Sequence, residues 1–212
     1  MTESDRKDLG SDFSTTVERL TGDDHRLAGI VTRHGVPEVF RRPPTFATLV
    51  LIILEQQVSL DSAAAAFRRL ADAAPIEPHA ILGHGDGVLF EAGFSRQKMR
   101  YVRALASACV SGELELEAMS TQTDDEVRRA LTALPGVGPW TADVFLLACL
   151  GRPDVWPTGD RALQVGAAEV LGLATVPTAA ELEFLGEGWR PYRSTAAQLI
   201  WHHYLSVRGR RA

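Results

Sequence analysis

Residues 134–142 read Leu-Pro-Gly-Val-Gly-Pro-Trp-Thr-Ala and lie between two segments with helical patterns. On the N-terminal side, Thr123 is followed three residues later by Glu126, the spacing of a capping box that opens a helix. On the C-terminal side, Pro139 occupies a first helical position and starts an apolar helix predicted to reach Leu150. Because glycine and proline interrupt the helical pattern between them, the stretch is predicted to be the turn of a helical hairpin.

The two glycines of this turn also make it a candidate anion site. Gly136 and Gly138 permit positive φ angles and leave the neighbouring backbone N–H groups unshielded. The helix that follows adds the positive end of its dipole. Such a turn can hold a phosphate oxygen, which is the sequence-independent anchoring that positions proteins on DNA. A tight turn without a ligand explains the two glycines equally well.

The rest of the chain is predicted to be helical, with proline and glycine clusters between short segments. Asp61 is placed to cap one of these helices, and Thr178 with Glu181 forms a second capping box. Alternating runs of β-branched residues are scarce, so the fold class is all-α. The further helices are predicted over about residues 46–58, 61–73, 95–107, 161–171 and 191–207.

The hairpin is followed by a proline-rich loop that ends in Pro157-Thr158-Gly159-Asp160. Hairpin, loop and aspartate together resemble the helix–hairpin–helix DNA glycosylase superfamily. Residues 53–59 (Ile-Leu-Glu-Gln-Gln-Val-Ser), 93–98 and 189–201 are similar to its 3-methyladenine DNA glycosylase II type. The resemblance covers roughly residues 40–207. It implies two helical lobes with a DNA-binding cleft between them.

This resemblance suggests a division of the chain. The expected parts are an acidic N-terminal segment (1–40), the glycosylase core (41–207) and a basic tail (208–212). The core is expected to comprise a first lobe (about 45–120), a hairpin lobe (about 121–175) and closing helices (176–207).

The aspartate is the candidate catalytic residue. Hydrolysis of an N-glycosidic bond passes through an oxocarbenium-like sugar, which a carboxylate can stabilise while it orients water. Asp160 also precedes a predicted helix, so a purely structural N-cap is the alternative, and the two roles are compatible. Bifunctional relatives carry a lysine in the second hairpin helix where this chain has Trp140, and Lys7 and Lys98 are its only lysines. We therefore expect a monofunctional hydrolase without abasic-site lyase activity.

The resemblance also implies residues that select and replace a flipped base. Trp140, Trp201 and Val144 align with the base pocket, and an indole face attracts a cationic alkylated purine by about 1–2 kcal/mol. Gln56 and Gln57 align with the wedge that fills the gap in the duplex, with Gln57 as the plug; core packing of the tryptophans and helix capping by the glutamines are the alternatives. Contacts to the DNA backbone are assigned to Gly136, Val137, Gly138, Thr141, Arg96 and Lys98.

Composition limits the cofactors and the surroundings. The net charge of −5 argues against binding of polyanions through overall charge. Two cysteines are too few for an iron–sulfur cluster, and the histidines show no metal-ligand spacing. Relatives hold a monovalent cation through hairpin carbonyls, here those of Leu134, Gly136 and Val137, so no cofactor is expected beyond Na⁺ or K⁺.

The expected protein is a soluble, cytoplasmic monomer, associated with the nucleoid if bacterial. The longest apolar run, residues 46–54, is less than half of the roughly 20 residues that a membrane span needs. The expected partner is double-stranded DNA with alkylated bases. Two other functions fit the same scaffold: a non-catalytic sensor of damaged DNA, which Asp160 disfavours, and a glycosylase for deaminated or oxidised bases.

Overall fold

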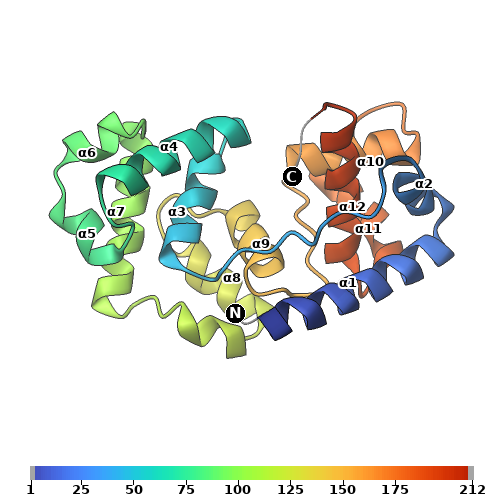
Figure 1. Ribbon diagram of the computed structural model, residues 1–212, viewed down its shortest axis with the longest axis horizontal. Helices are drawn as coiled ribbons and strands as arrows, with labels where there is room; N and C mark the ends of the chain where they lie inside the picture. The colour runs from blue at the N-terminus through green and yellow to red at the C-terminus, as the bar shows by residue number, and fades with distance from the viewer. Residues whose placement is uncertain (1–2, 210–212) are drawn as a thin grey trace. The chain divides into compact units, whose positions relative to one another are not determined.

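The structure is a computed structural model that describes the backbone of residues 3–209 and the side chains of residues 12–209. No strand occurs in these residues, which confirms the all-α class. In chain order (Figure 1) the helices are α1 (Glu3–Asp23), α2 (His25–His34), α3 (Phe46–Glu55), α4 (Leu60–Ala73), α5 (Pro78–Gly83), α6 (Asp86–Glu91), α7 (Arg96–Ser111), η1 (Glu117–Thr121), α8 (Asp124–Thr132), α9 (Pro139–Ala148), α10 (Arg161–Leu171), α11 (Ala179–Gly186), η2 (Glu187–Trp189) and α12 (Arg193–Ser206).

The helices form two compact units that divide the chain differently from the expected lobes. Unit 1 contains the chain up to Arg41 and from Gly151 onward, and unit 2 contains residues 42–150. Helices α8 and α9, expected in one lobe with Asp160, lie instead in unit 2 with α3. The reason is that α9 is apolar on nearly every side, so it is buried against both α3 and α8.

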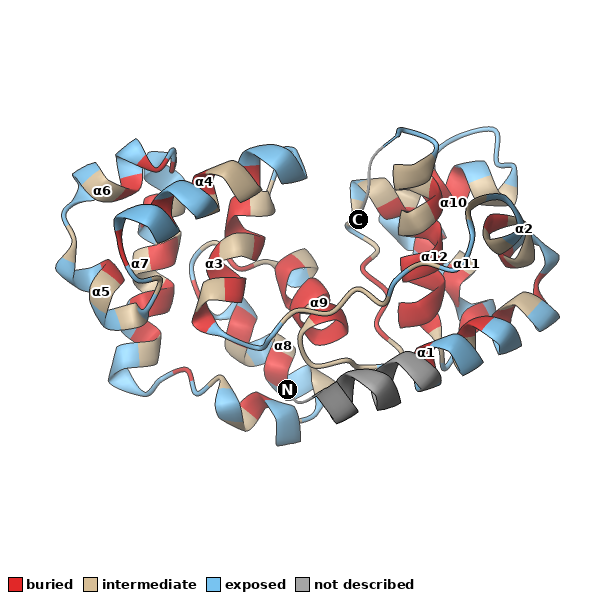
Figure 2. Cartoon of the chain, in the orientation of Figure 1, coloured by how far each residue is buried: buried red, intermediate tan, exposed pale blue. Residues whose placement is uncertain are grey.

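Unit 1 is built around α12, which packs against α1, α2 and α10 (Figure 2). The residues of α12 from Arg193 to Ile200 are all buried. Gly166 lets α10 approach α12, since a Cβ there would lie 2.8 Å from Cγ2 of Ile200. The N-terminal region, expected only as an acidic segment, forms α1 and α2.

Unit 2 shows how far local capping signals specify the helices. The capping box of Thr123 and Glu126 opens α8 as predicted, and the second predicted box opens α11 in unit 1. The predicted N-cap at Asp61 is wrong, because Ser59 caps α4 through a bond from the Ser62 N–H. The helix predicted to continue to residue 58 ends at Glu55.

None of the helices in the part of the chain that the structure describes is both long and apolar enough to cross a bilayer.

Candidate functional site

The hairpin turn lies in unit 2 between α8 and α9. Gly136 has φ +81, and the Tyr101 ring from α7 lies against its Cα, so that any Cβ at this position would overlap the ring. The Val137 N–H closes the turn on the Leu134 carbonyl at 3.1 Å. Gly138 is the N-cap of α9 and has no side chain to bond the first N–H groups of that helix. The predicted turn is therefore confirmed, and its role as an anion site stays a prediction.

Gln56 connects the end of α3 to this turn. Its Nε2 donates to the Gly136 carbonyl at 2.8 Å and to Oγ1 of Thr141 at 3.0 Å. Both amide hydrogens are used inside the unit, so Gln56 is not placed as a DNA wedge. Thr141 is 1% exposed, and its hydroxyl accepts from Gln56. The hydroxyl is therefore not at the surface, where the expected contact with a DNA backbone would require it.

Lys98 also bonds within unit 2. Its Nζ donates to the carbonyls of Leu54 at 2.6 Å and Gln56 at 2.9 Å, where it bonds the free carbonyls at the C-terminus of α3. Burial lowers the pKa of this ammonium. The expected phosphate contact of Lys98 is therefore replaced by bonds within the unit.

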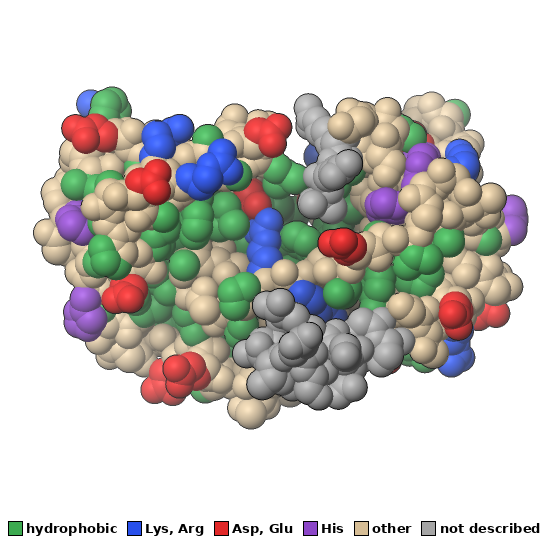
Figure 3. Space-filling view, in the orientation of Figure 1, with side chains coloured by type: hydrophobic (Ala, Val, Ile, Leu, Met, Phe, Trp, Pro, Cys, Tyr) green, Lys and Arg blue, Asp and Glu red, His purple; other side chains and the backbone are tan. Residues whose placement is uncertain are grey.

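Two arginines of α7, the helix that also carries Lys98, lie at the surface, where a phosphate contact is possible. Arg96 and Arg100 are exposed on α7. On the face of unit 2 in Figure 3, basic and acidic side chains are interspersed. Arg96 and Arg100 are four residues apart on α7 and therefore share a face of this helix.

Gln57, next to Gln56 in this loop, faces solvent. It is exposed and has φ +59, the left-handed conformation that ends α3 three residues before its predicted end. Val58 and Leu60 beside it are 46% and 48% exposed. With Gln56 and Lys98 holding the loop, Gln57 remains the wedge candidate.

The first turns of α9 carry the other predicted residues of unit 2. Trp140 is half-buried, whereas Val144 is 4% exposed and belongs to the core. The expected place of Val144 in the base pocket stays a prediction. Asp143 of the same helix accepts from Nε of Arg128 at 2.8 Å and joins α9 to α8.

Asp160 lies in unit 1 at the N-terminus of α10. Its Oδ1 accepts the Leu163 N–H at 2.7 Å, so the predicted N-cap is confirmed. The same oxygen accepts the indole N–H of Trp201 at 3.0 Å. The preceding turn is held by the Asp160 N–H on the Pro157 carbonyl, at 2.9 Å, and by Nε2 of Gln164 on the Thr158 carbonyl. The loop therefore presents a half-buried carboxylate of fixed orientation.

The predicted site residues fall into two sets. Unit 1 brings Asp160 and Trp201 together, and unit 2 brings Gln56, Thr141 and the hairpin together. The contacts of Gln56, Lys98 and Trp201 join residues 41 or more positions apart in the chain. No local pattern could have revealed them.

The hairpin, the loop and Asp160 lie within a region of the chain that matches a known protein family. The model of the HhH-GPD superfamily base excision DNA repair proteins matches residues 50–191. The chain belongs to this superfamily. The match includes the hairpin, the proline-rich loop and Asp160, and ends just before α12.

Individual relatives of the superfamily are named as enzymes or enzyme-like proteins that act on alkylated bases in DNA. The alkylbase DNA glycosidase-like protein mag2 of Schizosaccharomyces pombe is 32% identical over 128 residues, which cover 58% of this chain and 59% of mag2. The 3-methyladenine DNA glycosylase Mag1 of S. pombe, solved with abasic DNA, is 25% identical and has a TM-score of 0.80 over 88% of this chain and 95% of that one. A DNA-3-methyladenine glycosidase of Bacillus halodurans is 31% identical, with a TM-score of 0.73 over 92% and 91%.

Three of the six histidines, His34, His202 and His203, contact one another between α2 and α12. Nδ1 of the buried His203 lies 3.2 Å from Nε2 of His34, and its Nε2 lies 3.4 Å from Glu169. Burial lowers the pKa of His34 and of His203.

Arg208 of the expected basic tail pairs with Glu169 at 2.8 Å, while Arg210 and Arg211 lie outside the described residues. Within residues 12–209, no three His, Cys, Asp or Glu side chains converge as a metal site.

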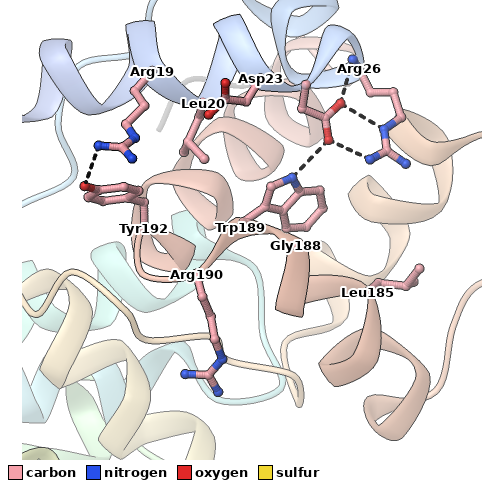
Figure 4. Close-up of a pocket in the computed structure, with 10 residues that line it drawn as sticks. Arg19, Leu20, Asp23, Arg26, Leu185, Gly188, Trp189, Arg190 and Tyr192 are labelled. Carbon is pink, nitrogen blue, oxygen red and sulfur yellow. Dashed lines mark hydrogen bonds and ion pairs between the residues drawn. The ribbon is translucent and has the colours of Figure 1, made fainter.

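A separate cavity of about 280 Å³ lies in unit 1 between α1, the start of α2 and residues 185–192 (Figure 4). Asp24 at its edge accepts from Nη2 of Arg26 at 2.6 Å and from the Trp189 indole at 3.0 Å. Arg19 donates to the Tyr192 hydroxyl at 3.2 Å. None of the predicted site residues lines this cavity, and these polar groups are bonded to one another.

Proposed function

We propose that the protein is a DNA glycosylase that removes alkylated purines from double-stranded DNA as a monomer. The single observation that supports this most is the Asp160 carboxylate, which two N–H donors orient on the loop that carries the aspartate of this superfamily. The relatives named as 3-methyladenine glycosylases supply the substrate class. The aligned region spans 59% of mag2, so the substrate of the whole protein is part of the proposal.

The chemistry follows from the charge of the transition state. As the bond from the sugar to the base breaks, positive charge develops on the sugar, and the Asp160 carboxylate stabilises it. The same carboxylate orients or deprotonates the water that attacks the anomeric carbon. The products are the free base and an abasic site.

The target base must leave the duplex before this carboxylate can act on its sugar. In the proposal, backbone N–H groups of the hairpin hold a phosphate next to the lesion. Gln57, an exposed residue of its loop, fills the gap that the base leaves. The indole rings of Trp140 and Trp201 attract the cationic purine, which is also a good leaving group.

The lack of a suitable amine favours hydrolysis over strand cleavage. A lyase step needs an amine that forms a Schiff base with the sugar. Trp140 stands where bifunctional members carry lysine, and Nζ of Lys98 is bonded to two carbonyls of its own unit. We therefore propose a monofunctional enzyme.

A monovalent cation at the hairpin is compatible with the carbonyls of Leu134, Gly136 and Val137. The Leu134 carbonyl accepts one N–H of the turn and the Gly136 carbonyl accepts one from Gln56. Each carbonyl oxygen has a second lone pair for an ion. In the proposal, Na⁺ or K⁺ at these oxygens stiffens the turn.

The test compares the wild type with Asp160→Asn on methylated duplex DNA. Asparagine is as good an N-cap as aspartate, so this variant keeps the start of α10 and removes only the charge. We expect the wild type to release 3-methyladenine and 7-methylguanine, measured by chromatography without alkali, and the variant to release them at least about 100-fold more slowly.

The other outcomes separate the alternatives. Binding to abasic DNA without release of any base would indicate a damage sensor. Release of deaminated or oxidised bases instead of methylated ones would change the substrate. Equal release by both proteins would show that Asp160 is only a helix cap.

A further inference from the structure

Two donors converge on one oxygen of Asp160. The Leu163 N–H reaches Oδ1 at 2.7 Å, and Nε1 of Trp201 reaches the same atom at 3.0 Å. The first bond is local, because Leu163 belongs to the helix that Asp160 caps and is three residues away in the chain. The second comes from α12, and it fixes the carboxylate against rotation about its side-chain bonds.

Trp201 is itself held in place by packed neighbours. The Phe40 ring meets the indole in an edge contact, with ring centroids 6.2 Å apart. The Phe40 N–H donates to Oε1 of Gln198 at 2.7 Å, and Gln198 is 4% exposed. Because Gly166 lets α10 pack closely on α12, the capping aspartate comes within reach of the indole.

We infer that Trp201 is a positioning residue, whose indole N–H holds the Asp160 carboxylate in the orientation that the developing sugar cation requires. This inference rests on the proposed function and deepens it. The N–H lies in the plane of the indole ring, so the bond uses the ring edge and not the ring face. Trp201 can thus orient Asp160 without giving up contact between its face and a base.

The structure offers a variant that separates these two roles. Trp201→Phe keeps an aromatic face but removes the N–H donor. If the role were only stacking against a base, phenylalanine would preserve most of the activity. If the N–H positions the carboxylate, the rate of bond cleavage falls while binding of the DNA product does not.

The same unit contains a matched control. Trp189 donates its indole N–H to Oδ2 of Asp24, also at 3.0 Å, and Asp24 caps α2 as Asp160 caps α10. Trp189→Phe therefore removes the same kind of bond, at the same length, from a carboxylate with no part in the proposed reaction.

The experiment measures single-turnover release of 7-methylguanine from a duplex, and the Kd for a duplex with an abasic site. We expect Trp201→Phe to slow release by about 10- to 100-fold and to leave the Kd within about twofold. Trp189→Phe is expected to release the base at the wild-type rate. In an Asp160→Asn background, Trp201→Phe should cause at most about a twofold further loss, because it acts through the carboxylate.

Two results would overturn the inference alone: a wild-type rate in Trp201→Phe, or equal losses from Trp201→Phe in the presence and absence of the Asp160 charge. A loss that appears in the Kd and not in the rate would assign Trp201 to binding and overturn it as well. Failure of the wild type to release any base would instead overturn the proposed function, and with it the role of Trp201.

Discussion

Unit 1 contains two tryptophan–aspartate pairs that share one local design. Asp24 and Asp160 are both helix N-caps, and each accepts an indole N–H at 3.0 Å. They differ in their surroundings, since Asp24 is 9% exposed and bonded through both oxygens to Arg26, whereas Asp160 is only half-buried. Hydrogen bonds from Arg26 hold the pKa of Asp24 far below its usual range. At Asp24, burial and the Arg26 guanidinium engage both carboxylate oxygens, which suits a structural role, whereas the half-buried Asp160 is compatible with the proposed chemistry.

The largest expected effect comes from neutralising the two carboxylates in turn. Asp160→Asn should lower the release of methylated bases at least about 100-fold, because a transition-state charge loses its stabiliser. Asp24→Asn should leave release within about twofold when both proteins are assayed well below their melting temperatures. Chromatography of the free bases measures both. A loss of comparable size in Asp24→Asn would show that the two pairs are not functionally distinct.

Removal of the indole donors should reverse that order, with the larger effect on stability at the buried pair. Trp189 is 4% exposed, and its bond goes to a buried charged group, so Trp189→Phe should cost about 1.5–3 kcal/mol of unfolding free energy. The half-buried Trp201 should cost about 0.5–1.5 kcal/mol on the same change. Urea unfolding curves of both variants give these values. Equal costs would mean that burial does not distinguish the pairs.

The sequence predicted the local half of each of these arrangements. Asp160 before a helix, and Thr123 or Thr178 three residues before a glutamate, are short-range patterns, and the structure confirms all three caps. The hairpin turn was predicted for the same reason. The superfamily, established by a match over residues 50–191, was expected from the resemblance of the hairpin, the loop and Asp160.

The other half depends on contacts between distant residues. Lys98 and Gln56 were expected to face DNA. Instead Lys98 donates to carbonyls 44 and 42 residues away, and Gln56 donates to a carbonyl 80 residues away. Trp201 was expected in the base pocket, and its N–H bond to Asp160 was not predicted. The helix α1 had a readable signal in its buried residues Phe13, Val17 and Leu20, which recur at helical spacing. The acidic composition of the region obscured it.

The pH dependence of stability should separate the pairs further. The folded state holds the pKa of Asp24 below its ordinary value of 3.8, so the folded state binds fewer protons than the unfolded state in acid. Its contribution to stability is therefore complete above about pH 5 and declines as the pH falls through 3.8. The difference in unfolding free energy between the wild type and Asp24→Asn should be smaller at pH 3 than at pH 6. A difference in unfolding free energy that does not change with pH would show that the ionised Asp24 carboxylate and its pair with Arg26 do not stabilise the fold.

The smallest expected effect comes from changing the spacing of the helices that carry the Asp160 pair. A Cβ at Gly166 would lie 2.8 Å from Cγ2 of Ile200 and 3.0 Å from its carbonyl oxygen, so Gly166→Ala must move α10 away from α12. The overlap costs about 1–3 kcal/mol, and the better helix propensity of alanine returns about 1 kcal/mol. Because the same movement lengthens the bond from Trp201 to Asp160, base release should fall by a few-fold, roughly the loss of part of one hydrogen bond.

Gly172→Ala is a matched control for backbone effects, since Gly172 ends α10 in a left-handed conformation with open space around it. It should lower the unfolding free energy by about 1 kcal/mol through the strained φ angle and leave base release unchanged. If Gly166→Ala and Gly172→Ala lowered release equally, stability alone would explain the loss. A loss in Gly166→Ala alone, absent in the Trp201→Phe background, would show that the spacing of α10 and α12 acts through the bond from the indole to the carboxylate.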